Sequence, residues 1–140
     1  MARTLRPPDW HDLKAPGLAT FEAIAMEAYR RLPAAFRDLT REVQIRIDEF
    51  PTDEVLDDLG IASELDLLGL YQGVPISQRG ATDPPLQPDR VYLYRRPILD
   101  YWAEHDITLG NVIVHVLVHE IGHHFGFSDD DMARIEDEAG

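Results

Sequence analysis

The sequence predicts an α+β fold in which about five helices surround a small β-sheet. Apolar residues recur at three- and four-residue steps in some segments, as in helices, and alternate with polar residues in others, as in strands. The chain has 140 residues, of which 44% are hydrophobic and 28% are charged. These values are typical of one compact globular domain that buries its own core.

The first predicted features are an irregular N-terminal arm and a helix. Residues 1–17 contain three prolines and lack hydrophobic periodicity, so we expect no regular element there. Residues 18–32 are predicted to form a helix, with Thr20 as its N-cap and Pro33 stopping or redirecting the chain. Its apolar face consists of Phe21, Ile24, Ala25, Ala28 and Leu32.

A strand and a short helix are expected next. Residues 42–50 alternate cleanly between apolar and polar and should form a half-buried strand that ends at Pro51. Thr52 then caps a short helix, which Gly60 closes. Residues 67–76 mix apolar residues with two glycines and a proline, which indicates a short, interrupted edge strand.

The second half of the chain should contain one strand and three helices. Residues 77–88 hold three prolines and are expected to form a loop, and residues 90–95 to form a strand. Pro97 can open a short helix. Residues 109–125 form an apolar run too long for a strand and are predicted to be a buried helix, and residues 129–138 a short acidic one.

The composition excludes several classes of function. Thirteen Lys and Arg residues stand against 26 Asp and Glu residues, which gives a net charge of −13. Such a chain repels nucleic-acid phosphates and anionic membrane surfaces, so we expect neither as a partner. There is no cysteine, so a disulfide framework and thiolate-bound metals are excluded. Any metal must be held by His, Asp or Glu.

The N-terminal residues include two arginines but no apolar stretch behind them, so we expect no signal peptide. The longest apolar run, residues 112–118, contains His115 and is far too short to cross a bilayer. The predicted location is cytoplasmic.

Residues 119–129 carry the most informative pattern. On a helix, His119 and His123 lie one turn apart on the same face, so both imidazoles can reach one metal ion. Glu120 projects beside this pair, where it can hold a water molecule at the ion. Gly126 can adopt the left-handed conformation that ends a helix, and the turn would bring Asp129 back as a third ligand.

Two imidazoles, a carboxylate and an open position are typical of catalytic zinc. From the frequencies of His and Glu in this sequence, a His-Glu-x-x-His motif is expected by chance about 0.02 times in a chain of this length. Requiring the glycine and the aspartate as well lowers the expectation to about 10⁻⁴. The extended pattern is therefore specific.

Residues 119–129 resemble the H-E-x-x-H-x-x-G-x-x-D signature of the small bacterial zincin-like metallopeptidases, which have a minimal zincin fold. Residues 69–75 and 92–98 also look like that family, so the likeness covers residues 18–138 approximately. The resemblance implies a small mixed sheet packed on helices that include the HExxH active-site helix. It also implies a single zincin-like domain over residues 18–140.

The same resemblance implies one zinc ion per chain, held by His119, His123 and Asp129, with Glu120 as the general base. The predicted function is a zinc-dependent metallopeptidase-like hydrolase that acts on the peptide bonds of a peptide or protein substrate. An extended substrate could lie along the edge strand near residues 70–76, by analogy with larger zincins.

Two alternative functions stay open. In the first, the chain is a non-catalytic protein-interaction module in which zinc only fastens the C-terminal turn to the core. In the second, two histidines and one aspartate hold iron(II) for an oxygenase, which leaves Glu120 unexplained.

Alternatives for single residues also stay open. His115 is more often a core residue or a partner of a ligand than a ligand, and His124 is expected at the surface or beside a ligand. Asp130 and Asp131 are expected to stabilise a helix N-terminus. An oxyanion stabiliser would come from the tyrosines and arginines of the two later strands: Tyr71, Tyr92, Tyr94, Arg95 and Arg96.

Overall fold

The computed structural model describes residues 11–73 and 88–139. Within these ranges it confirms an α+β fold with a small mixed sheet. The elements run in the order α1 (Leu18–Arg30), α2 (Ala34–Thr40), β1 (Gln44–Asp48), α3 (Asp53–Leu59), the 3-10 helix η1 (Glu64–Asp66), β2 (Gly69–Gln72), β3 (Arg90–Tyr94), α4 (Arg95–Glu104), α5 (Leu109–His124) and α6 (Asp129–Ala139).

The sheet has the strand order β1-β3-β2, with β1 parallel and β2 antiparallel to the central β3. In this register, Ile45 and Ile47 of β1 lie beside Val91 and Leu93 of β3, so the apolar residues of both strands share one face. Val91 and Leu93 are fully buried. This face of the sheet is therefore the face that packs on the helices.

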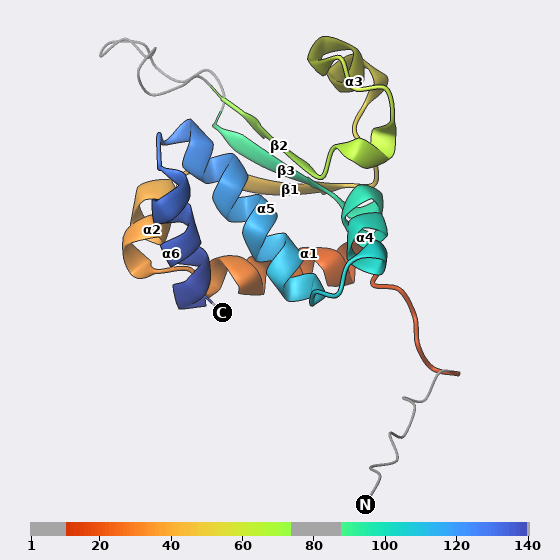
Figure 1. Cartoon of the computed structure of the whole chain (residues 1–140), viewed down its shortest axis with the longest axis horizontal. Coiled ribbons are helices and arrows are strands. Elements are labelled where there is room, and N and C mark those ends of the chain that lie inside the picture. Colours follow the sequence, from red (N-terminus) through yellow and green to blue (C-terminus); the bar gives the residue numbers. More distant parts are fainter. Residues whose placement is uncertain (1–10, 74–87, 140) are drawn as a thin grey trace, which may run out of the picture.

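Helix α5 lies at the centre of the core. It contacts α1, α4 and α6 as well as β2 and β3, and Figure 1 shows it between α6 and the sheet, with α1 near its lower end. Fully buried side chains from three successive turns, Ile113, Leu117 and Ile121, make up its apolar face. Thr108 caps its N-terminus by accepting a hydrogen bond from the Asn111 amide at 3.2 Å. No helix in the ranges that the structure describes is long and apolar enough to cross a membrane.

Several predicted elements are confirmed. Thr52 accepts a hydrogen bond from the Val55 amide at 3.2 Å, and Gly60 ends α3 with φ of 68°. The predicted edge strand is present as β2, which is four residues long, whereas residues 74–76 and most of the predicted loop lie outside the described residues. The same holds for residues 1–10 of the predicted arm, and residues 11–17 form no helix or strand.

Three local predictions are corrected. Helix α1 begins at Leu18 because the Phe21 amide already donates to the Gly17 carbonyl at 2.8 Å, so Thr20 lies inside the helix and is not its N-cap. Pro33 does more than end α1: it is the N-cap of α2, a helix that the sequence reading missed. Helix α4 begins at Arg95, before Pro97, which sits in its first turn where a missing amide costs little.

Two glycines allow close packing around α5. A Cβ on Gly69 of β2 would lie 2.6 Å from Cγ1 of Val116 and 2.9 Å from the Tyr92 carbonyl oxygen. A Cβ on Gly122 of α5 would lie 2.6 Å from Sδ of Met132, which is fully buried on α6. The absence of side chains at these two positions therefore sets how closely β2 and α6 approach α5.

Gly69→Ala should destabilise the protein by about 1–3 kcal/mol, because the new methyl group meets both a buried side chain and backbone. Gly110→Ala is the matched control: Gly110 lies in α5 with open space around the position of its Cβ, so alanine there should be neutral or stabilise by up to about 1 kcal/mol. Chemical denaturation of the two variants measures both values. Equal stability of Gly69→Ala and wild type would contradict this account of the packing.

Candidate metal centre

Three histidines lie on successive turns of α5, at positions 115, 119 and 123. The ring centroids of His115 and His119 are 4.0 Å apart, and those of His119 and His123 are 5.8 Å apart. A helix places residues four apart on one face, which accounts for the alignment. His119 is therefore flanked by an imidazole on each side.

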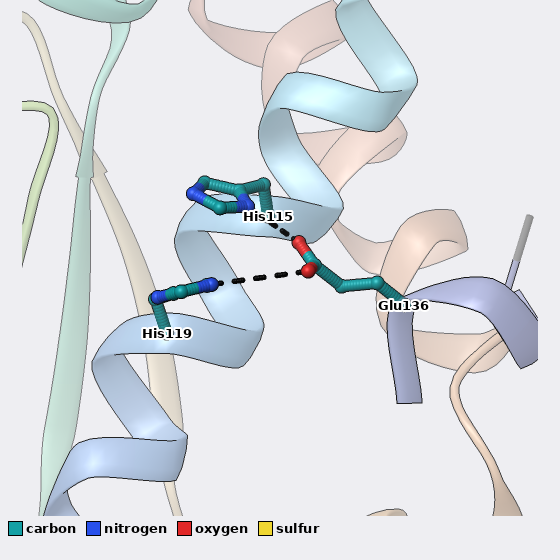
Figure 2. A group of neighbouring side chains, drawn as sticks. All are labelled: His115, His119 and Glu136. Carbon is teal, nitrogen blue, oxygen red and sulfur yellow. Dashed lines mark hydrogen bonds and ion pairs between the residues drawn. The ribbon is translucent and has the colours of Figure 1, made fainter. Parts of the chain in front are cut away.

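The structure brings His115 and His119 together with Glu136 of α6. Nδ1 of His115 lies 2.6 Å from one carboxylate oxygen of Glu136, and Nε2 of His119 lies 3.8 Å from the other (Figure 2). One donor atom from each of the three residues lies within 4.8 Å of the other two, close enough for these residues to hold a metal ion. His115 is not a core residue, because its side chain is 56% exposed.

The two other predicted ligands lie close by but are not members of that group. His123 is exposed on the turn after His119, and Asp129 is exposed at the first position of α6. Asp129 is near enough to His119 for its charge to raise the pKa of that imidazole. His119 thus lies between two sets of donors, one toward Glu136 and one toward His123 and Asp129.

The pKa of His119 lies below the ordinary value for histidine. Burial is the main cause, and the neighbouring imidazole of His115 also lowers it, while the charges of Glu136 and Asp129 oppose part of the shift. A lowered pKa keeps the imidazole neutral near pH 7, which is the form that binds metals.

Glu120 lies on the side of α5 that faces β2. Its Cγ is 3.5 Å from the position that a Cβ on Gly69 would take. Burial raises the pKa of Glu120, and the charge of His123 and a hydrogen bond from the Tyr71 backbone lower it in part. A half-buried carboxylate with a raised pKa, beside two histidines and an edge strand, is suited to accept a proton.

Helix α5 is fastened to β2 one turn further along. The rings of Tyr71 and His124 stack with centroids 3.9 Å apart, and the Tyr71 hydroxyl donates to Asp89 at 2.8 Å. Nε2 of His124 lies 3.4 Å from the same carboxylate oxygen, and the His124 side chain is only 6% exposed. His124 is thus a packing residue, and the expectation of a surface position is wrong.

The turn between α5 and α6 has the predicted form. Gly126 has φ of 78°, in the left-handed region that favours glycine. The Gly126 amide donates to the His123 carbonyl at 3.2 Å and the Phe127 amide to the Gly122 carbonyl at 2.9 Å, which together form a Schellman motif.

Helix α6 starts with a reciprocal cap. The Asp131 amide donates to the Ser128 hydroxyl at 3.1 Å, and the Ser128 amide donates to the Asp131 carboxylate at 3.3 Å. These hydrogen bonds hold the pKa of Asp131 below its usual range. Asp131 is therefore engaged at the helix N-terminus, as expected.

The aromatic and basic residues considered as oxyanion stabilisers have structural partners. Arg95 donates from Nε to the Pro16 carbonyl at 2.7 Å and pairs with Glu49, and Arg96 lies over the Phe50 ring. Tyr94 is buried, and burial, with the nearby Asp48 charge as the next cause, raises its pKa to about 12. These contacts give each of the three a role in packing.

Glu136 is the site residue that sequence reasoning missed. In the sequence, Glu136 is one of several acids in the stretch that follows Gly126, and most carboxylates of that stretch are exposed. Nothing in the sequence distinguishes it from the others. The alignment of His115 with His119 was visible in the spacing, but its pairing with an acid required the packing of α6 on α5.

A family model described as zincin-like metallopeptidase matches residues 40–139. The match covers β1 to α6, so it includes every residue of the candidate site. No curated protein matches the chain.

Gly126→Val should destabilise the protein by at least about 1–2 kcal/mol, because a side chain with a branched Cβ is strained at positive φ. It should also weaken zinc binding without removing a ligand, since the turn sets where Asp129 lies. Gly126→Asn is the control, because asparagine tolerates this conformation better. Thermal unfolding and zinc titration of both variants test this. If Gly126→Val unfolds at the wild-type temperature and binds zinc with the wild-type affinity, the left-handed turn is not needed for stability or for zinc binding.

Proposed function

The chain belongs to the zincin-like metallopeptidase family, and from this premise we propose that it is a zinc-dependent hydrolase of peptide bonds. The family implies a bound metal. The position of Glu120 carries the proposal: it follows His119 directly, lies at the inner face of β2, and is partly withdrawn from water. A cytoplasmic location stays a prediction.

The donor set supports zinc as the ion. His119 and His123 are aligned on successive turns, the lowered pKa of His119 favours its neutral form, and the charge of Asp129 reaches His119. Neutral imidazoles and a carboxylate are zinc donors, and together they leave a position open. We propose His119, His123 and Asp129 as the ligands.

Zinc, when bound, polarises the scissile carbonyl and lowers the pKa of a water molecule. Glu120 accepts the proton of the attacking water and donates it to the amine that leaves when the C–N bond breaks. The raised pKa of Glu120 lies closer to neutral pH than that of an ordinary glutamate. A carboxyl group with such a pKa can both accept and donate a proton during the reaction.

Strand β2 is proposed to position the substrate. It is an edge strand of the described sheet, and Gly69 and Tyr71 place its inner face against Val116, Glu120 and His124. An extended peptide that pairs with this edge of the described sheet would pass beside Glu120.

Two sets of metal donors share His119: one adds His123 and Asp129, and the other adds His115 and Glu136. Single-residue variants distinguish which set binds the ion. We expect His119→Ala, His123→Ala and Asp129→Ala each to weaken zinc binding at least tenfold, about 1.4 kcal/mol. Competition with a chromophoric chelator measures the affinities.

The matched controls are His115→Ala, Glu136→Gln, Asp130→Ala and Asp131→Ala, which should change the affinity by no more than a few-fold. The opposite pattern, with affinity lost in His115→Ala and Glu136→Gln but kept in His123→Ala, would assign the ion to His115, His119 and Glu136 instead.

Glu120→Gln tests the catalytic step. We expect this variant to bind zinc with wild-type stoichiometry and to lose hydrolysis of peptide libraries by at least about 100-fold, because general-base catalysis typically contributes that much. Undiminished turnover would exclude Glu120 as the base. Zinc binding without any turnover in the wild type would favour the non-catalytic interaction module.

A further inference from the structure

A cleft of about 560 Å³ opens beside the N-terminal half of α5. Its apolar lining includes Leu68, Val112 and Val116, together with Tyr101 and Ile107, which are 39% and 37% exposed. Its volume lies within the range of pockets that bind ligands. Large apolar side chains that are more than a third exposed around a cleft indicate a surface that another molecule covers.

The cleft adjoins the proposed catalytic position. Val116 in its wall lies one turn before Glu120, and the missing Cβ of Gly69 would touch both side chains. One helical turn between them corresponds to about 6 Å along the axis, and two residues of an extended peptide span about 6.6 Å. A substrate side chain two positions from the reacting carbonyl would therefore reach the cleft.

The charge of the cleft is negative. Glu136 and Asp137 of α6 line it, and neither lysine nor arginine is among its described lining residues. His115 and Tyr101 are the other ionisable residues of the lining, and Nδ1 of His115 lies 2.6 Å from Glu136. The whole chain carries a net charge of −13, which also favours the approach of a cationic partner.

We infer that this cleft binds an arginine or lysine side chain of an extended peptide substrate. Long cationic side chains lay their methylene stems on apolar walls and keep the charged group at a polar end. The valines and Leu68 match the stem, and the carboxylates of Glu136 and Asp137 match the cation. This inference rests on the proposed function and names its substrate class: peptides with a basic residue near the cleaved bond.

Binding and cleavage are measured separately. Fluorescent peptide mixtures of random sequence carry either arginine or its uncharged isostere citrulline at one fixed position. Their affinity for the zinc-loaded Glu120→Gln protein is measured by anisotropy. The arginine mixtures should bind about tenfold more tightly than the citrulline mixtures, equivalent to about 1.4 kcal/mol. Cleavage of the same mixtures by the wild type tests the proposed function independently.

Charge-removing variants locate the preference. Asp137→Asn and Glu136→Gln, each in the Glu120→Gln background, should reduce the ratio of the two affinities at least threefold. Glu138→Gln is the matched control, because the neighbouring Glu138 lines a different cleft on the other side of α6. It should keep the full ratio.

Equal affinities for arginine and citrulline mixtures, including no measurable binding of either, would overturn the inference. An arginine preference that Glu138→Gln reduces as much as Asp137→Asn would also overturn it, because the general charge of the protein would then be the cause. If the protein binds the arginine mixtures selectively but the wild type cleaves none of them, the cleft binds a cationic side chain and the proposed hydrolase function is rejected.

Discussion

The close approach of α5 to its neighbours is the constraint on which the rest of this structure depends. Helix α5 is buried against β2 on one side and α6 on another, and at both contacts a glycine removes the side chain that would hold the elements apart. The surface left uncovered is a narrow strip, and His115, His119 and His123 lie along it. Polar chemistry on a helix packed in this way is confined to that strip and its borders.

The sequence predicted best those features that depend on short-range backbone rules. The left-handed Gly126, the Thr52 cap with Gly60, and the helical spacing of His119 and His123 each follow from residues within a few positions of one another. The mixed sheet and the family came from a longer pattern, and the family match supports them.

Features that depend on tertiary packing were not predictable in the same way. The burial of His124 follows from its stacking on Tyr71, a residue distant in sequence. Glu136 is one of several acids on α6, and its place beside His115 depends on the packing of α6 against α5, where Met132 lies on Gly122. Helix α2 was missed because a proline that ends one helix can equally begin the next.

His119 links the chemistry of both sides of the strip. It lies within reach of Glu136 in the structure and of His123 and Asp129 in the proposed zinc site. The carboxylates of Glu136 and Asp129 add negative charge near His119, which suits a dication and also a cationic peptide group. Metal binding and substrate binding would therefore draw on one electrostatic field.

The edge of β2 that pairs with no strand in the described ranges has a consequence for self-association. A strand edge that can pair with an extended substrate can also pair with another copy of the same chain, which is the first step of fibril formation. Two features oppose this: β2 is only four residues long, and each copy carries a net charge of −13. Mutual repulsion of the copies opposes pairing of their edges, and high salt, which screens that repulsion, weakens this opposition.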